Sequence, residues 1–312
     1  MRIGWRKGND FLQLPLAAKN ANSVPMALPS ASQTSALIAE SSPLLRQAVR
    51  MALNNLGIKN IAESSSISST YEHLKKETFD LVILNSDIDN SDAFFLVKEL
   101  RRGKLGVDIF SAVILVLTKN DEFHVKGAVN SGADAAVLVP FAPDQLMAKI
   151  SALMQSRAPF IVTHDYIGPD RRKQTRSGPS ARTFTAPNPL KARTLALPET
   201  RYKAIVAQVR SDIFAERVKR LAHHLEWGSR DLAARARDGL LTADYSIPNL
   251  FVLEAVTEEL IERLEEDGTA VDDLEGFRSI CLEMKSAASK AAYRDFEVLH
   301  EKARKITSRH CD

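Results

Sequence analysis

The chain has 312 residues, of which 45% are hydrophobic and 26% are charged, and its formal net charge is +3 at pH 7. This length predicts about two domains, and the composition excludes a fibrous or wholly disordered chain. The small net charge gives no reason to expect strong nucleic-acid or membrane binding.

Residues 1–34 are expected to form a flexible arm, because prolines stand among Ser, Asn and Ala without a sustained period. Pro15 interrupts the apolar run FLQLPLAA, which is shorter than the core of a secretion signal. No stretch approaches the roughly 18 apolar residues that cross a bilayer. The only cysteines, Cys281 and Cys311, do not suggest a disulfide framework. We therefore expect a cytoplasmic protein without a membrane segment.

Short apolar runs alternate with amphipathic stretches over residues 35–156. The five expected strands cover 35–39, 58–63, 80–85, 112–118 and 135–140. The five expected helices cover 44–56, 71–77, 93–102, 122–132 and 144–154. This order predicts an α/β domain with a doubly wound, five-stranded parallel sheet, in which ligand chemistry gathers at the carboxyl ends of the strands.

Residues 157–199 are rich in Pro, Ser, Thr and Arg and are expected to form a basic, flexible linker. The basic residues between Arg171 and Arg193, where no acidic residue occurs, are Arg171, Arg172, Lys173, Arg176, Arg182, Lys191 and Arg193. Arg171, Arg172 and Arg176 are candidate anion contacts, and the last two have the RxxxR spacing that resembles the start of cyclic-di-nucleotide-binding PilZ domains. No D-x-S-x-x-G element follows, so a solvated basic tether is favoured.

Helical periodicity dominates residues 200–308 and predicts a separate all-α domain, either a helical bundle or a helical homodimer. Ser246 before Pro248 is expected to cap its middle helix, and Thr269 with Asp272 is expected to cap the next. The apolar stripe from Leu274 to Leu299 continues for about seven turns and predicts one long helix.

The order and spacing of the α/β elements resemble the receiver domain of two-component response regulators over residues 35–156. In that family an acid pair holds magnesium and an aspartate ending the third strand accepts a phosphoryl group. A Ser or Thr after the fourth strand and a Lys before a cis-type proline then respond to the bound phosphoryl group. The positions that match this pocket, with the adjoining loop acid, are Glu40, Ser41, Asn85, Asp87, Thr118, Val139 and Pro140.

Three of these positions depart from the family pattern. Ser41 replaces the second metal-binding acid, Asn85 replaces the phosphoacceptor, and Val139 replaces the lysine. A carboxylate that attacks a phosphoryl donor needs cations to neutralise the developing charge, and an amide cannot form an acyl phosphate. Thr118 matches outright and Pro140 retains the turn. We therefore expect a pseudo-receiver with no catalytic residue, no metal and no cofactor.

The loop after Asn85 carries Asp87, Asp89 and Asp92, which offer a substitute acceptor. The metal and lysine positions remain wrong whichever aspartate is used. The favoured interpretation is that these acids solvate the loop and cap the third helix.

The paired histidines His223 and His224, followed by Gly228, weakly resemble a phosphotransfer bundle, in which glycine leaves room for an incoming receiver. Trp227 stands where that family has lysine. Paired histidines on an amphipathic helix are more often surface or hydrogen-bonded core groups. Phosphotransfer through His224 nevertheless remains an alternative function.

The favoured hypothesis is a bacterial signalling protein that is not an enzyme and acts by binding other signalling proteins, with homodimerisation through the C-terminal helices. The alternatives are phosphotransfer and nucleic-acid association through residues 171–193. No helix-turn-helix is evident, because the C-terminal helices are long and acidic around EELIERLEED, which would repel phosphate. The segment THDYIGPDRRK (163–173) is similar to a tail that follows receiver-like domains in some bacterial regulators, and it predicts no chemistry.

Overall fold

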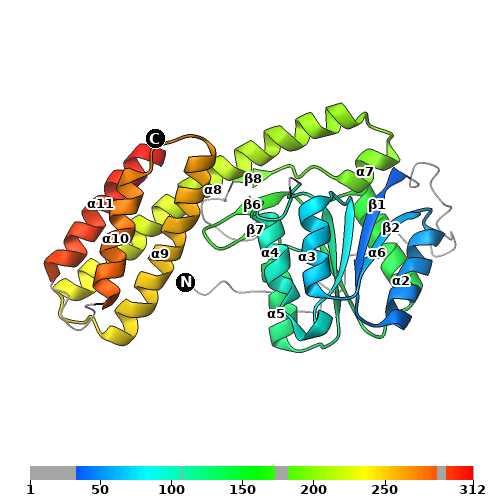
Figure 1. Ribbon diagram of the computed structural model, residues 1–312, viewed down its shortest axis with the longest axis horizontal. Helices are drawn as coiled ribbons and strands as arrows, with labels where there is room; N and C mark the ends of the chain where they lie inside the picture. The colour runs from blue at the N-terminus through cyan, green and yellow to red at the C-terminus, as the bar shows by residue number, and fades with distance from the viewer. Residues whose placement is uncertain (1–32, 107, 173–181, 287–292, 312) are drawn as a thin grey trace. The chain divides into compact units, whose positions relative to one another are not determined.

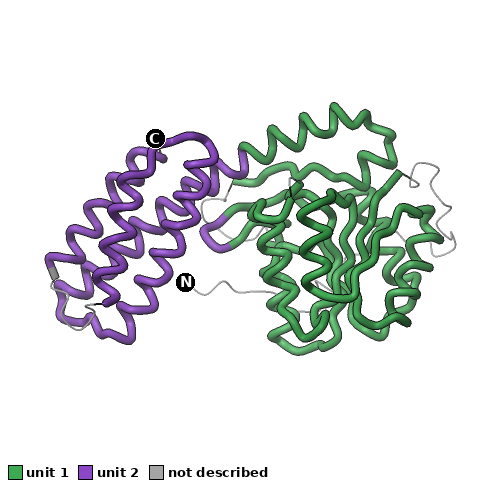
Figure 2. The backbone as a smooth tube through the Cα atoms, in the orientation of Figure 1, with its two compact units in different colours: residues 1–162, 166–211 green, residues 163–165, 212–312 purple. Residues whose placement is uncertain are grey.

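The computed structural model describes residues 33–106, 108–172, 182–286 and 293–311. The expected N-terminal arm, apart from its last two residues, lies outside this range, as do Lys173 and Arg176. The chain divides into two compact units (Figure 2): residues 1–162 with 166–211, and residues 163–165 with 212–312.

The first unit contains a five-stranded parallel sheet in the order β2-β1-β3-β4-β5 (Figure 1). Its strands are β1 (Ser35–Ala39), β2 (Asn60–Ser64), β3 (Leu81–Asn85), β4 (Ala112–Leu117) and β5 (Ala135–Leu138). Its helices are α2 (Pro43–Asn55), α3 (Ile67–Lys76), α4 (Ala93–Arg101), α5 (Glu122–Ser131) and α6 (Pro143–Gln155), with a 3-10 turn η2 (Ile88–Asn90). The predicted doubly wound α/β fold is confirmed.

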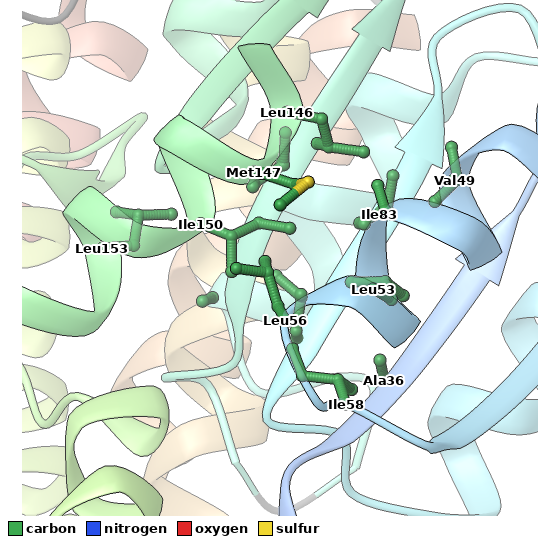
Figure 3. Packing of buried hydrophobic residues seen from close by; sticks show 14 of the residues in the cluster. Ala36, Val49, Leu53, Leu56, Ile58, Ile83, Leu146, Met147, Ile150 and Leu153 are labelled. Atoms are coloured by element: carbon green, nitrogen blue, oxygen red, sulfur yellow. The ribbon is translucent and has the colours of Figure 1, made fainter. Parts of the chain in front are cut away.

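Each face of the sheet is covered by its own set of helices. Ala36 and Ile38 of β1 pack with α2 and α6, whereas Leu37 and Ala39 point to the opposite face and pack with α3, α4 and α5. On the first face, side chains of α2 and α6 interdigitate over the sheet (Figure 3). Strands β3 and β4 are buried along their whole length, as central parallel strands require.

The prediction of a flexible linker over residues 157–199 is wrong for its described part. Strands β6 (Phe160–Val162), β7 (Ile167–Pro169) and β8 (Thr183–Phe184) form a second sheet in the order β7-β6-β8, and helix α7 (Pro189–Thr194) follows. Leu190 of α7 is fully buried in the core cluster that α2 and α6 build. The strands of this structured extension are only two or three residues long and stand among proline and polar residues, so the sequence pattern did not indicate them.

Two glycines allow β7 to lie against the end of α5. A Cβ on Gly168 would lie 2.7 Å from the Cα of Gly132, and a Cβ on Gly132 would lie 2.5 Å from the carbonyl oxygen of Ile167. Gly132 also has φ of +90°, which an L side chain rarely adopts. The segment Y-I-G-P-D (166–170) is therefore part of the packing of the first unit.

The second unit is helical in its described part, as predicted. Its helices are α8 (Glu199–Arg237), whose first turns group with the first unit, α9 (Ala243–Glu266), α10 (Asp272–Ser286) and α11 (Tyr293–Cys311). In the part of the chain that is described, no helix is both long and apolar enough to cross a bilayer.

Two predictions inside the helical unit are wrong. The single helix over residues 274–299 is replaced by α10 and α11, which pack side by side, as one continuous helix cannot do (Figure 1). The middle helix starts at Ala243 with Thr242 at the N-cap position, so Pro248 lies inside it. The turn before Pro248 is already helical because the backbone N–H of Ser246 donates to the carbonyl of Thr242 at 2.9 Å.

Candidate functional site

The carboxyl ends of β1, β3 and β4 bring the predicted pocket residues together. Glu40 follows β1, Asn85 ends β3 and Thr118 follows β4, and parallel strands end at one edge of a sheet. After β5, Val139 packs against the apolar core, and the Val139–Pro140 peptide bond is cis. This edge of the sheet therefore gathers Glu40, Asn85 and Thr118, and it carries an aliphatic side chain, Val139, after β5.

Asn85 is paired with the buried carboxylate of Glu40. Their exposed fractions are 5% and 3%, and Asn85 Nδ2 donates to Glu40 Oε2 at 2.7 Å. The other carboxylate oxygen accepts the backbone N–H of Ser42 at 2.8 Å, and Asn85 Oδ1 accepts the backbone N–H of Asp87 at 2.8 Å. The amide donates on one side and accepts on the other, which an ionised carboxylate cannot do, so Asn85 fits this position better than a second carboxylate would.

An arginine that the sequence interpretation missed lies beside this pair. Arg46 donates to the backbone carbonyl oxygens of Glu40 at 2.5 Å and of Ser41 at 3.4 Å, and it forms an ion pair with Glu63 at 3.2 Å. Ser41 itself is exposed. The sequence signal that could have indicated Arg46 was its position, one helical turn after Ser42, which caps α2.

A histidine that the sequence interpretation also missed contacts Asp87. His124 Nε2 lies 3.3 Å from Asp87 Oδ1, and His124 Nδ1 lies 2.7 Å from Asp121 Oδ1. Thr118 Oγ1 donates to the other oxygen of Asp87. Hydrogen bonds from the backbone N–H and the ring of His124 lower the pKa of Asp121. The available signal was that His124 occupies the buried side of the first turn of α5, three residues after the Asp121 cap.

The other two loop acids serve helix ends. Asp89 Oδ2 accepts the backbone N–H of Ile67 at the start of α3 at 2.9 Å. Asp92 Oδ1 accepts the N–H groups of Phe94 and Phe95 and caps α4, so the predicted capping of the third helix is confirmed for Asp92. Among the described residues, no group of three or more His, Cys, Asp and Glu side chains converges as metal ligands would.

The predicted anion contacts are occupied within the chain where they are described. Arg171 is half-buried and donates to the Ala133 carbonyl, and desolvation of the guanidinium lowers its pKa. Arg172 pairs with Asp170 at 2.7 Å. The prediction of a solvated Arg171 is therefore wrong, because β7 brings this residue against the start of β5. Arg176 lies outside the described residues.

A buried ion cluster fastens the extension to the amino-terminal end of the sheet. Asp134, which precedes β5, accepts Arg101 at 2.9 Å and Arg157 at 2.7 Å, and both guanidinium groups are almost fully buried. Burial alone would raise the pKa of Asp134, but the charges of Arg157 and Arg101 outweigh it and lower the pKa. Burial lowers the pKa of Arg101 to about 10. Arg157 also donates to the Pro187 carbonyl at 2.7 Å, which ties down the chain before α7.

His224 lies on α8 in a stack of rings. Its imidazole is parallel to that of His164, with 4.1 Å between ring centroids. Burial lowers the pKa of His224 to about 4, so the ring is neutral at pH 7. A Cβ on Gly228 would lie 2.8 Å from Leu253 Cδ2. The space that this glycine provides is therefore used for the close approach of α8 and α9.

Comparison with known proteins agrees with this geometry. Residues 36–151 match the response regulator receiver domain family. The phosphate regulon transcriptional regulatory protein of Escherichia coli K12 is 28% identical over 126 residues, which are 40% of this chain and 54% of that protein. The Fimbriae Z protein of Salmonella typhimurium is 23% identical over 104 residues, 33% of this chain and 48% of that protein. The chain thus spans about half the length of the curated relatives it matches.

Solved structures include similar receivers. The CheY-like receiver domain protein of Methanospirillum hungatei is 17% identical, with a TM-score of 0.35, over 38% of this chain and 91% of that chain. An orphan response regulator of H. pylori is 18% identical, with a TM-score of 0.34, over 39% of this chain and 96% of that chain. The family match identifies residues 36–151 as a receiver domain, and this region ends before the β6–β8 extension and the helical unit.

Proposed function

We propose, from the premise that residues 36–151 form a response regulator receiver domain, that this chain is a two-component signalling protein whose receiver works without phosphorylation of an aspartate. The observation that carries the proposal is the closed Glu40–Asn85 pair at the end of β3. An amide there supplies neither the charge nor the nucleophilic oxygen that an acyl phosphate requires.

The residues of this pocket do not fit the magnesium ion that phosphoryl transfer requires. Both carboxylate oxygens of Glu40 already accept hydrogen bonds, and Ser41 provides no second carboxylate. The side-chain oxygen of Asn85 accepts the N–H of Asp87. Magnesium takes near-ideal octahedral oxygen coordination and releases its waters reluctantly, so such a partial set binds it poorly. Magnesium-dependent phosphoryl transfer at this site is therefore not part of the proposed function.

The proposed output is contact with other signalling proteins in the cytoplasm, with no catalysis by this chain. Receiver domains act by presenting a surface to a partner, and here that surface is set by the folded chain rather than by a phosphoryl group. Homodimerisation through the helical unit belongs to the same proposal, and it would use apolar side chains that the bundle leaves exposed, such as Trp227 and Phe251.

The alternative functions gain less support from the contacts. His224 is neutral, as a nucleophile must be, but its ring stacks on His164 and the neighbouring Gly228 packs against α9. Nucleic-acid association would use the cations of residues 171–193. Arg171 and Arg193 already use their positive charges in contacts inside the first unit, where Arg193 pairs with Asp80 at 3.1 Å. We therefore favour the binding role.

Incubation of the full chain with acetyl phosphate and magnesium is expected to leave its mass unchanged, because position 85 offers no acceptor carboxylate. Intact-mass spectrometry at neutral pH measures this directly. Phosphorylation that maps to residues 85–92 and is lost in Asp87→Asn would contradict the proposal. Label that is lost only in His224→Gln would favour phosphotransfer instead.

A further inference from the structure

We propose that the carboxyl edge of the sheet contains an anion-binding site that the chain fills with its own Asp87 carboxylate. The inference rests on the proposed function, since it explains how this edge is held in one arrangement without a phosphoryl group. The ligand class of the site is a small oxyanion, either a carboxylate or a phosphate.

Two polar side chains from different elements converge on Asp87. The hydroxyl of Thr118, just after β4, donates to Oδ2, and Nε2 of His124, in the first turn of α5, lies 3.3 Å from Oδ1. Each ring nitrogen of His124 faces a carboxylate oxygen, Nε2 that of Asp87 and Nδ1 that of Asp121, so the tautomer with its hydrogen on Nε2 donates to Asp87. Convergent donors of this kind hold anions in proteins, and hydrogen bonds to charged acceptors are the stronger class.

The backbone places Asp87 so that its side chain reaches these donors. Its N–H donates to Asn85 Oδ1 at 2.8 Å, and the next residue, Ile88, is fully buried in the core. The amide of Asn85 thus connects the buried Glu40 to the loop that carries Asp87. A continuous set of hydrogen bonds runs from the end of β1 through β3 and the loop to β4 and α5.

The neighbouring acids behave differently, which makes them matched controls. Asp89 and Asp92 accept backbone N–H groups at the starts of α3 and α4. Asp87 instead joins Thr118 and His124, which neither Asp89 nor Asp92 contacts among the described hydrogen bonds. Its side chain is 31% exposed, whereas that of His124 is 9% exposed. The site therefore opens to solvent on the Asp87 side, and a small anion can enter once the carboxylate is removed.

The test uses the full chain with Asp87→Ala, and Asp89→Ala as the control. Hydrogen–deuterium exchange of peptides covering residues 117–126 should become about tenfold faster in Asp87→Ala, because Thr118 and His124 lose their shared acceptor. Acetate or inorganic phosphate should slow that exchange toward the wild-type rate, and chloride at equal ionic strength should not. Asp89→Ala should affect the start of α3 and leave these peptides unchanged.

The isosteric Asp87→Asn variant keeps one acceptor oxygen and should show a smaller acceleration that acetate does not reverse. The proposal is overturned if exchange of residues 117–126 is unchanged in Asp87→Ala. It is equally overturned if acetate protects the Asp87→Ala variant no better than the Asp87→Ala/Thr118→Val double variant. The exchange experiment contains no phosphoryl donor, so its outcome does not depend on whether the chain can be phosphorylated. Phosphorylation of wild type by acetyl phosphate would contradict the proposed function but would leave the anion-binding site unaffected.

Discussion

Replacing Asn85 with aspartate is expected to destabilise the first unit by about 3 kcal/mol at pH 7. The new carboxylate would face Glu40 Oε2 at the 2.7 Å now spanned by a hydrogen bond, with both groups almost fully buried. Denaturant unfolding followed by pulsed hydrogen exchange of β1 and β3 peptides measures the loss in this unit alone.

The pH dependence and a double variant separate charge repulsion from general damage. Like charges raise the pKa of one carboxyl of the Asn85→Asp pair, so the folded state binds a proton that the unfolded state has released. The destabilisation should therefore be full above that raised pKa and should disappear as the pH falls toward the unfolded value of about 4. Glu40→Gln/Asn85→Asp restores an amide opposite a carboxylate and should recover most of the loss. An Asn85→Asp variant as stable as wild type at pH 7 would contradict the account of the pocket.

Replacing Asp134 with asparagine is expected to cost about 3 to 5 kcal/mol, because it leaves the buried guanidinium groups of Arg101 and Arg157 without their shared carboxylate. Hydrogen exchange of the backbone amides of β4 and β5, measured over the same denaturant concentrations, reports this loss of stability. The extension should loosen with the sheet, so peptides of β6 and β7 should lose protection in the same variant.

The exposed pair Glu122–Lys126 on α5 provides the control for charge removal. Its side chains are 79% and 59% exposed, so Glu122→Gln should leave the exchange of the β4 and β5 amides unchanged. Equal effects of Asp134→Asn and Glu122→Gln would mean that the buried cluster does not fasten the extension.

The α/β unit was predictable because its signals are local and repeated. The run DLVILN reads as a buried central strand, and Ser42 with Pro43 marks a helix start that the structure bears out. The extension was not predictable, because its order depends on contacts distant in sequence. Arg157 meets Asp134, and Gly168 meets Gly132, across gaps that no local pattern reports.

The positions of the pocket residues were predictable from the sequence, but the hydrogen bonds between them were not. Resemblance placed Glu40, Asn85 and Thr118 at one edge, and the alternating elements made that placement reliable. It gave no means of finding His124, which looks like an ordinary residue of an amphipathic helix. The stripe that suggested one helix over residues 274–299 failed for a related reason, since periodicity does not say where a chain turns back.

Titration of the full chain with beryllofluoride in the presence of magnesium tests the central claim most directly, because this complex mimics a phosphoryl group on a receiver aspartate. Isothermal calorimetry is predicted to detect no saturable, magnesium-dependent binding, since Asn85 is an amide already bonded to Glu40. Binding of one beryllofluoride per chain that requires magnesium would show that this edge still accepts a phosphoryl group.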